Sequence, residues 1–187
     1  MVIQNINLKN LREKYKNTEF VGFFKEIFEL FKPHTYVELG VKKGYTFNQL
    51  SPLVSRAIAV DLIIRKSIIK LNNVETYEMT TDKFSSIWKD PIDFLFIDAD
   101  HKKEQVLKDF ENCSKFVKSG TGIIALHDTH PIDKSLLNND NCSNSWEAAW
   151  EIRKNQKYSD FEIITLPGPF AGLSLIRKSK EQLSWRN

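Results

Sequence analysis

Two runs of acidic residues and histidines could carry chemistry in this 187-residue sequence. The first is Phe96-Ile-Asp98-Ala-Asp100-His101, and the second is Leu126-His127-Asp128-Thr129. Both follow short apolar segments that are typical of buried strands. If the two strand ends are neighbours, their carboxylates and imidazoles share one edge, where the negative charges of the carboxylates raise one another's pKa unless a cation or a substrate proton offsets them. The runs therefore predict a site for proton transfer, metal binding or both.

A third run, Glu38-Leu-Gly40-Val41-Lys-Lys-Gly44-Tyr45-Thr46, has an acid near a strand end and two glycines four residues apart. Glycines allow the backbone to pass close to a ligand. The run lacks the G-x-G-x-x-G spacing that holds a pyrophosphate in dinucleotide-binding folds. It resembles instead motif I of class I S-adenosylmethionine-dependent methyltransferases, E/D-x-G-x-x-x-G. The resemblance implies S-adenosyl-L-methionine as the cofactor, whose ammonium group suits a carboxylate such as Glu38.

The same resemblance implies further cofactor contacts. Asp61 lies 23 residues after Glu38, at the end of the next predicted strand, and would accept the ribose hydroxyls. Thr81 would lie near the adenine, although a helix N-cap at Asp82 explains that segment equally well. The glycines could also be turn residues only, and Asp61 a helix N-cap. The implied cofactor-binding set is Glu38, Gly40, Val41, Gly44, Tyr45, Thr46, Asp61, Thr81 and Asp98.

Within that class, the F-I-D-A-D-H and H-D-T runs resemble the cation-dependent catechol and caffeoyl-coenzyme A O-methyltransferases. They are more similar still to the macrolide sugar O-methyltransferase and cephalosporin-hydroxylase-like group. Matching by position implies metal ligands at Asp98, His127 and Asp128, and a general base at His101, where catechol-type enzymes have lysine. Asp98, His101 and His127 are thus the implied catalytic residues.

The implied reaction is methylation of a hydroxyl whose pKa a divalent metal lowers and whose proton His101 accepts. Histidine at the second ligand position and at the base position departs from the catechol-type pattern. The metal could therefore be Mg²⁺ or another divalent cation. Without a metal, His101 or His127 could act as the base alone.

From Thr35 onward, short β-branched or aromatic runs alternate with segments of helical period. This pattern predicts an α/β, Rossmann-like, doubly wound and mostly parallel seven-stranded sheet with a C-terminal antiparallel hairpin, the class I methyltransferase fold. The predicted strands are residues 35–40, 56–62, 73–79, 93–100, 122–128, 161–166 and 171–178. The predicted helices are residues 46–55, 63–71, 82–90, 102–118 with Gly120 after the last, and one from Trp146 with a capping box at Asn144 and Glu147. Residues 131–145 are expected to form an irregular loop.

The chain is expected to be one domain, with a helical segment at residues 1–33 and the S-adenosylmethionine-binding methyltransferase domain at residues 34–187. The N-terminal helix is predicted to bury Phe20, Phe23, Phe24, Ile27, Phe28 and Phe31. Trp146 and Trp150, four residues apart, are predicted to be core residues. Cys113 and Cys142 are too few for a disulfide scaffold and are expected to be free thiols.

The composition is that of an ordinary globular protein, with 41% hydrophobic and 27% charged residues and a net charge of +3. No apolar stretch approaches the roughly 20 residues of a membrane span, and no secretory signal is visible, so we expect a cytoplasmic protein without a membrane partner. The charges are mixed along the chain and do not indicate nucleic acid. The sequence leaves homo-oligomerisation open.

The leading hypothesis is an enzyme that O-methylates a small hydroxylated acceptor, such as a sugar or a secondary metabolite. A non-catalytic cofactor-binding module is an alternative, although a mere binder has no need of clustered titratable groups. A nicotinamide-dependent oxidoreductase is a weaker alternative because G-x-G-x-x-G is absent. The acceptor itself has no recognisable signature in the sequence.

Overall fold

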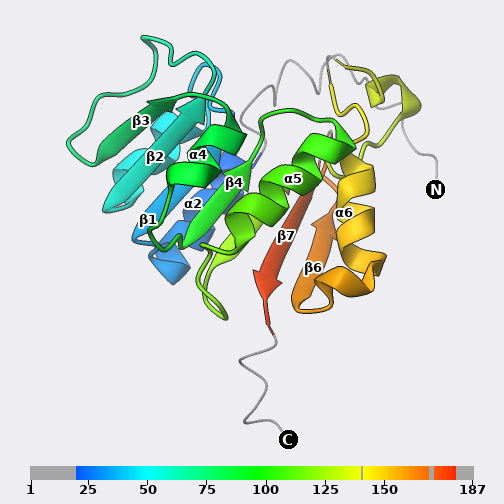
Figure 1. Cartoon of the computed structure of the whole chain (residues 1–187). Coiled ribbons are helices and arrows are strands. Elements are labelled where there is room, and N and C mark those ends of the chain that lie inside the picture. Colours follow the sequence, from blue (N-terminus) through cyan, green and yellow to red (C-terminus); the bar gives the residue numbers. More distant parts are fainter. Residues whose placement is uncertain (1–19, 140, 169–170, 180–187) are drawn as a thin grey trace, which may run out of the picture.

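A computed structural model describes residues 20–139, 141–168 and 171–179. It contains a seven-stranded sheet in the order β3-β2-β1-β4-β5-β7-β6 (Figure 1). The strands are β1 (Thr35–Leu39), β2 (Arg56–Asp61), β3 (Val74–Glu78), β4 (Phe94–Ile97), β5 (Ile123–His127), β6 (Phe161–Leu166) and β7 (Leu173–Lys178). The α-helices are α2 (Val21–Phe31), α3 (Phe47–Leu50), α4 (Thr81–Ile87), α5 (Lys103–Ser114) and α6 (Ser145–Lys154). Short 3-10 helices are η1 (Ser51–Leu53), η2 (Lys134–Leu136) and η3 (Gln156–Tyr158).

The first five strands are parallel, and β7 lies antiparallel between β5 and β6. Every residue of β1 and β4 is buried, as expected for central strands that are covered on both faces. This arrangement confirms the predicted α/β fold and its antiparallel C-terminal pair. In the described part of the chain, no helix is long and apolar enough to cross a bilayer.

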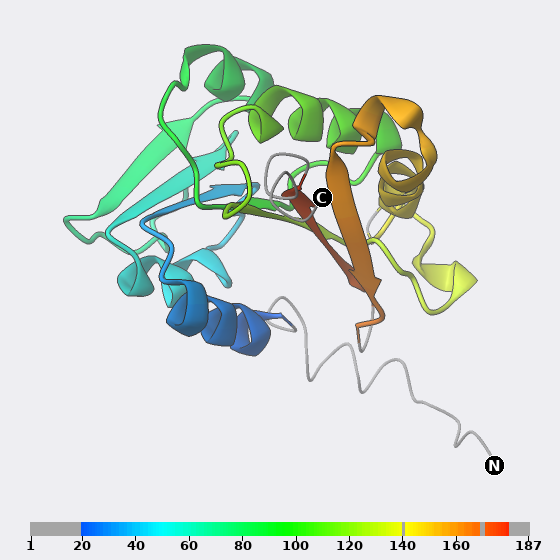
Figure 2. The ribbon, with the colours of Figure 1, turned by 90° about the horizontal axis from the view of Figure 1, so that it is seen from below.

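The sheet has a hydrophobic core on each face, because successive side chains of a strand point to opposite sides. Helices α4, α5 and α6 cover one face, and α2 and α3 cover the other (Figure 2). The second core is rich in aromatic rings. The Phe24 centroid lies 5.2 Å from that of Phe94 and 5.1 Å from that of Phe96.

Helix α2 confirms part of the predicted N-terminal helix, and residues 1–19 of that segment lie outside the described residues. Four of its six predicted apolar positions are buried, but Phe23 and Phe31 are exposed. The set of residues predicted to be buried was too large, because only one face of helix α2 meets the sheet. Cys113 and Cys142 are buried free thiols, as expected.

The predicted helix at residues 63–71 does not form. Side chains from other segments hydrogen-bond its backbone instead: Glu78 accepts from the Ile64 amide at 2.9 Å, and Asn48 accepts from the Ile69 amide at 2.9 Å. Asn48 also donates to the Ser67 carbonyl at 2.7 Å. These bonds hold the segment as an irregular connection, which the local apolar spacing did not reveal.

Helix α5 ends at Ser114, earlier than the predicted end at residue 118. The residues beyond it pair with the segment before β4, where the Ile92 amide donates to Phe116 and the Lys118 amide donates to Ile92. The predicted capping box of α6 is also wrong. Asn144 makes no cap bond, and its Oδ1 accepts from the Lys103 amide at the start of α5, at 2.9 Å.

Trp146 and Trp150 are not core residues, because they are 37% and 51% exposed. Helix α6 instead buries Ala148, Ala149 and Ile152 against the sheet. The small alanine side chains allow α6 to lie close to the sheet, so the larger tryptophan rings face outward. On that outer face, the Lys154 ammonium lies 4.1 Å from the Trp150 ring centroid.

Candidate functional site

The carboxyl ends of β1, β2, β4 and β5 lie at one edge of the sheet, because these strands are parallel and contiguous. Leu39 pairs with Ile97, so the residues that follow β1 and β4 lie side by side. The Asp98 amide donates to the Leu39 carbonyl at 2.9 Å, which extends this pairing beyond the strands. The three runs that the sequence singled out therefore meet at one edge.

The turn after β1 requires glycine at its first position. Gly40 has φ of +90°, and a Cβ atom there would lie 2.3 Å from the Asp98 carbonyl oxygen. Gly44 also has a positive φ, of +78°. The Lys42 amide donates to Asp61 Oδ2 at 2.7 Å, so the turn is tied to the end of β2. The structure thus brings together Gly40, Asp61 and Asp98, three of the predicted cofactor positions.

The other predicted positions in this turn differ in exposure. Val41 is buried, Thr46 is half-buried at the start of α3, and Tyr45 is 41% exposed. Gly44 is close-packed, since a Cβ atom there would lie 2.8 Å from the Ile68 side chain. Tyr45 is therefore the member of this group with a side chain free to meet a ligand.

Thr81 lies at the start of α4 and faces α5. Its hydroxyl donates to Asp109 Oδ1 at 2.6 Å, and Gln105 donates to the same oxygen at 2.8 Å. Burial raises the pKa of Asp109 to about 6 despite these two bonds. The N-cap of α4 is Thr80, which accepts from the Lys83 amide, so the alternative of a cap at Asp82 is wrong.

Glu38 is buried within the sheet, and the Tyr36 hydroxyl donates to its Oε2. Burial raises the pKa of Glu38 to about 8, against the lowering effect of the Tyr36 hydrogen bond. The charge of Asp98 raises the pKa further, and that of His127 lowers it. Glu38 is therefore neutral near pH 7 and lies within electrostatic reach of the residues after β4 and β5.

Four side chains at the ends of β4 and β5 form what we call the His–Asp cluster: Asp98, His101, His127 and Asp128. His101 Nε2 lies 3.1 Å from Asp98 Oδ1, and His101 Nδ1 lies 3.0 Å from Asp128 Oδ2. His127 Nδ1 lies 3.0 Å from Asp98 Oδ1 and 3.1 Å from Asp128 Oδ1. Asp100 stays outside the cluster, exposed, and accepts from the Lys102 amide.

The charges within the cluster compensate one another. Burial lowers the pKa of His101, but hydrogen bonds with Asp128 and Asp98 outweigh it and raise the pKa to about 10. Burial likewise opposes the charges of Asp128 and Asp98 at His127, whose pKa lies well above its usual value. The pKa values of both carboxyls are lowered, because the imidazoles outweigh the effect of burial. Two imidazolium and two carboxylate groups thus form a neutral set when only protons are bound.

Two elements that sequence reasoning missed hold the cluster in place. The His127 ring meets Phe20 and Phe96 edge-on, each at a centroid distance of 5.8 Å. In the loop before α6, the Asn141 carbonyl approaches His101 Nδ1. At the first residue of α6, the buried Ser145 hydroxyl donates to the Asp128 carbonyl at 2.5 Å. The sequence predicted only an irregular loop at residues 131–145 and gave no sign of these contacts.

The cluster can supply a set of metal ligands, and that set includes Asp98 and His127, two of the three ligands expected from the sequence. One atom each from Asp98, His101 and His127 lie within 4.8 Å of one another. Asp128, the third expected ligand, lies 3.0 Å from His101 Nδ1 and 3.1 Å from His127 Nδ1. A carboxylate with two imidazoles is a donor set that fits a divalent transition metal.

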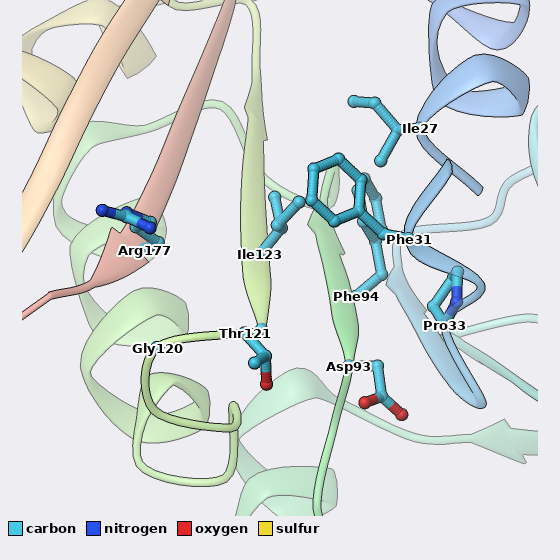
Figure 3. A pocket seen from close by; sticks show the side chains of 10 residues that line it. Ile27, Phe31, Pro33, Asp93, Phe94, Gly120, Thr121, Ile123 and Arg177 are labelled. Carbon is cyan, nitrogen blue, oxygen red and sulfur yellow. The ribbon is translucent and has the colours of Figure 1, made fainter. Parts of the chain in front are cut away.

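A separate hollow of about 440 Å³ lies at the opposite edge of the sheet, where β4 and β5 begin (Figure 3). Its charged lining residues are paired: Asp93 with Lys118 and Arg177 with Glu162, each at 2.6 Å. Apolar side chains such as Phe31 and Ile123 make up much of the rest. The hollow lies away from the carboxyl ends of the strands, so it is not the candidate active site.

Residues 37–129 match the family model of a methyltransferase domain. This span covers about half of the chain and contains Glu38, Asp61 and the whole His–Asp cluster. The chain carries a class I, S-adenosylmethionine-dependent methyltransferase domain. No curated protein matches the chain.

Solved structures with different acceptors share the fold of this methyltransferase. A candidate caffeoyl-CoA O-methyltransferase from Staphylococcus aureus is 17% identical, with a TM-score of 0.66 over 94% of each chain. The O-methyltransferase TomG from Streptomyces achromogenes, solved with S-adenosylmethionine, is 13% identical, with a TM-score of 0.64 over 96% of this chain and 92% of its own. A candidate rRNA methylase from Clostridium thermocellum is 15% identical, with a TM-score of 0.63 over 86% and 97%. At these identities the likeness shows the fold and leaves the acceptor open.

Proposed function

We propose that this methyltransferase transfers the methyl group of S-adenosyl-L-methionine to a hydroxyl oxygen of a small molecule, such as a sugar or a secondary metabolite. One observation carries the proposal. Asp98 lies between the Gly40 turn with Asp61 on one side and the two histidines of the His–Asp cluster on the other. A methyl donor over β1 and β2 and an acceptor over β4 and β5 would meet at Asp98. Such positioning accelerates a transfer between two bound molecules.

The chemistry of the cluster favours a hydroxyl acceptor. An alcohol must lose its proton to become a good nucleophile, and groups that hold or move protons assist that step. A non-catalytic binding module is disfavoured for the same reason, since the clustered titratable groups would serve no purpose in it. The O-methyltransferases among the structural relatives support this choice of acceptor atom.

Asp98, His101 and His127 would hold a divalent cation, which when bound would lower the pKa of an acceptor hydroxyl. His101 is the base proposed from the sequence. While it pairs with Asp98 and Asp128, it keeps its own proton at neutral pH, because those carboxylates raise its pKa to about 10. A positive charge next to Asp98 would oppose that rise, and a bound cation or methylsulfonium group would therefore favour the neutral form of His101, which can accept a proton or bind a cation.

The experiment that tests the proposal compares two acids two residues apart. We expect Asp98→Asn to lower kcat/KM for methyl transfer by roughly 10²–10⁴-fold, the usual contribution of a group that assists proton transfer. Affinity for S-adenosylhomocysteine, measured by calorimetry, is expected to stay within about tenfold of the parent. Asp100→Asn is the matched control, because Asp100 lies outside the cluster, and it should leave turnover unchanged.

Substrate screening would use hydroxylated acceptors with divalent cations present, and mass spectrometry would locate the added methyl group. Full turnover by the Asp98→Asn variant would contradict the catalytic role of the cluster. Methyl groups found only on nitrogen or carbon would contradict O-methylation.

A further inference from the structure

Residues 141–145, where the long loop joins α6, contact His101, the start of α5 and the residue after β5. The Asn141 carbonyl oxygen lies 2.5 Å from His101 Nδ1. Because a carbonyl oxygen can only accept a hydrogen bond, Nδ1 is the donor of this pair. The other ring nitrogen, Nε2, then faces Asp98, 3.1 Å from its Oδ1. The main chain of the loop therefore decides which nitrogen of His101 points toward Asp98.

Asn144 supplies a cap that α5 lacks. The N-cap residue of α5, Lys102, makes no side-chain hydrogen bond, and the first amides of a helix have no partner within the helix. Asn144 Oδ1 accepts from the Lys103 amide at 2.9 Å, as an N-cap side chain would do. Helices α5 and α6 lie side by side on the sheet (Figure 1). The bond therefore fixes the start of α5, two residues after His101, against the start of α6.

The Asp128 main chain is held by the same stretch of chain. The buried Ser145 hydroxyl donates to the Asp128 carbonyl at 2.5 Å. Asp128 and Ser143 have φ values of +57° and +46°, in the left-handed region that is unfavourable for residues with a side chain. Such conformations persist where surrounding contacts enforce them, and they are common at functional sites. Both acceptors near His101 Nδ1, the Asn141 carbonyl and Asp128, are thus held by residues 141–145.

This stretch is itself anchored by buried contacts. Cys142, Leu136 and Ala171 form a small hydrophobic core that is distinct from the two cores of the sheet. The Cys142 amide also donates to the Leu136 carbonyl at 3.0 Å. An anchored main chain can hold a side chain in one orientation, whereas a loosely held one cannot.

We propose that Asn144 is a positioning residue for methyl transfer, which acts by holding His101 with Nε2 toward Asp98. The inference rests on the proposed function for its purpose. It applies whether Nε2 accepts a proton or binds a cation, because both roles need the same ring orientation. A displacement of about 1 Å in a reacting geometry can cost roughly 100-fold in rate. Loss of the Asn144 bond should therefore lower kcat.

The test compares two substitutions of Asn144. We expect Asn144→Ala, which removes the acceptor, to lower kcat by roughly 10- to 100-fold and to change the KM for S-adenosylmethionine little. Asn144→Asp keeps an acceptor oxygen, and a carboxylate is favourable at the start of a helix. It should recover most of the kcat that Asn144→Ala loses.

A second measurement needs no turnover. The Nδ1 hydrogen of His101, held between acceptors, should exchange slowly with water and give a downfield proton NMR signal in protein with ¹⁵N-labelled histidine. His101→Gln identifies this signal among those of the four histidines. We expect the signal in the parent and in Asn144→Asp, and its loss through faster exchange in Asn144→Ala.

Asn155→Ala is the matched control. Asn155 Oδ1 accepts from the Lys157 amide at 3.0 Å, at the start of η3 and beyond the other end of α6. The substitution removes a bond of the same kind, so a similar fall in the midpoint of thermal unfolding is expected. Its kcat and its His101 signal should equal those of the parent.

Lys103→Pro breaks the Asn144 bond from the donor side and serves if Asn144→Ala does not fold. Proline lacks the amide hydrogen but is well tolerated at the first position of a helix. The preceding residue, Lys102, already has the extended conformation that proline requires, with φ of −76° and ψ of 134°. Lys103→Ala accounts for loss of the lysine side chain. We expect the proline variant alone to lose kcat and the His101 signal.

Two results would overturn the inference. The first is an Asn144→Ala or Lys103→Pro variant that keeps the kcat and the His101 signal of the parent. The second is an equal loss of kcat in Asn155→Ala, which would show a general effect of lower stability. Failure of the proposed function is a separate result: the His101 signal would respond as expected while no hydroxylated acceptor is methylated.

Discussion

Replacing Gly40 with alanine tests whether the close approach of β1 and β4 builds the site. The new Cβ atom would lie 2.3 Å from the Asp98 carbonyl oxygen and 2.5 Å from the Ala99 Cα atom. Both are backbone atoms, so no side chain can rotate to make room. The φ of +90° adds a conformational cost of about 1–2 kcal/mol for a residue with a side chain. The clash must be relieved by moving the ends of the two strands apart.

We therefore expect Gly40→Ala to lower the free energy of unfolding by about 2–4 kcal/mol, the range of substitutions that force strain on buried structure. The assay is urea unfolding, with S-adenosylhomocysteine affinity measured on the folded variant. Affinity should also fall, because Asp98 and the turn move relative to Asp61.

The matched control is Gly22→Ala. Gly22 lies in α2, and a Cβ atom there would meet nothing within 4 Å. Alanine at an unhindered helical position should raise stability by about 0.5–1 kcal/mol. A Gly40→Ala variant with the stability and the cofactor affinity of the parent would refute the argument that this close approach shapes the site.

Two further predictions concern buried groups near the site. Because burial raises the pKa of Glu38 from 4.5 to about 8, the folded state holds this proton more tightly than the unfolded chain does. The contribution of Glu38 to stability should therefore be complete below about pH 4.5 and be lost as pH rises through 8. Glu38→Gln should remove this contribution to the pH dependence of unfolding measured from pH 5 to 9. An equal decline in the parent and the variant would contradict the raised pKa. Ser145→Ala removes the hydroxyl that donates to the carbonyls of Asp128 and Cys142. We expect this change to lower the free energy of unfolding by about 1–3 kcal/mol. An unchanged free energy of unfolding would show that the loop before α6 does not depend on this hydroxyl.

Much of the fold could be predicted because its signals are local. The continuous apolar character of residues 94–97 and the apolar run before Asp61 follow from burial on both faces of a parallel sheet. The order of strands and helices then placed the three chemical runs at one edge. The helix predicted at residues 63–71 was wrong because Asn48 and Glu78, both distant in sequence, take up its backbone groups.

The candidate site, like the fold, could be predicted from the sequence only in part. By itself the sequence determined which residue types gather at the strand ends, since a motif's spacing and its place after a strand are properties of a short stretch of chain. Only the tertiary structure decided how those groups pair. The contacts of His101 with Asp128 and Asn141, and of His127 with Phe20, join residues far apart in the chain. Such contacts depend on side-chain packing between elements, and no local pattern specifies them.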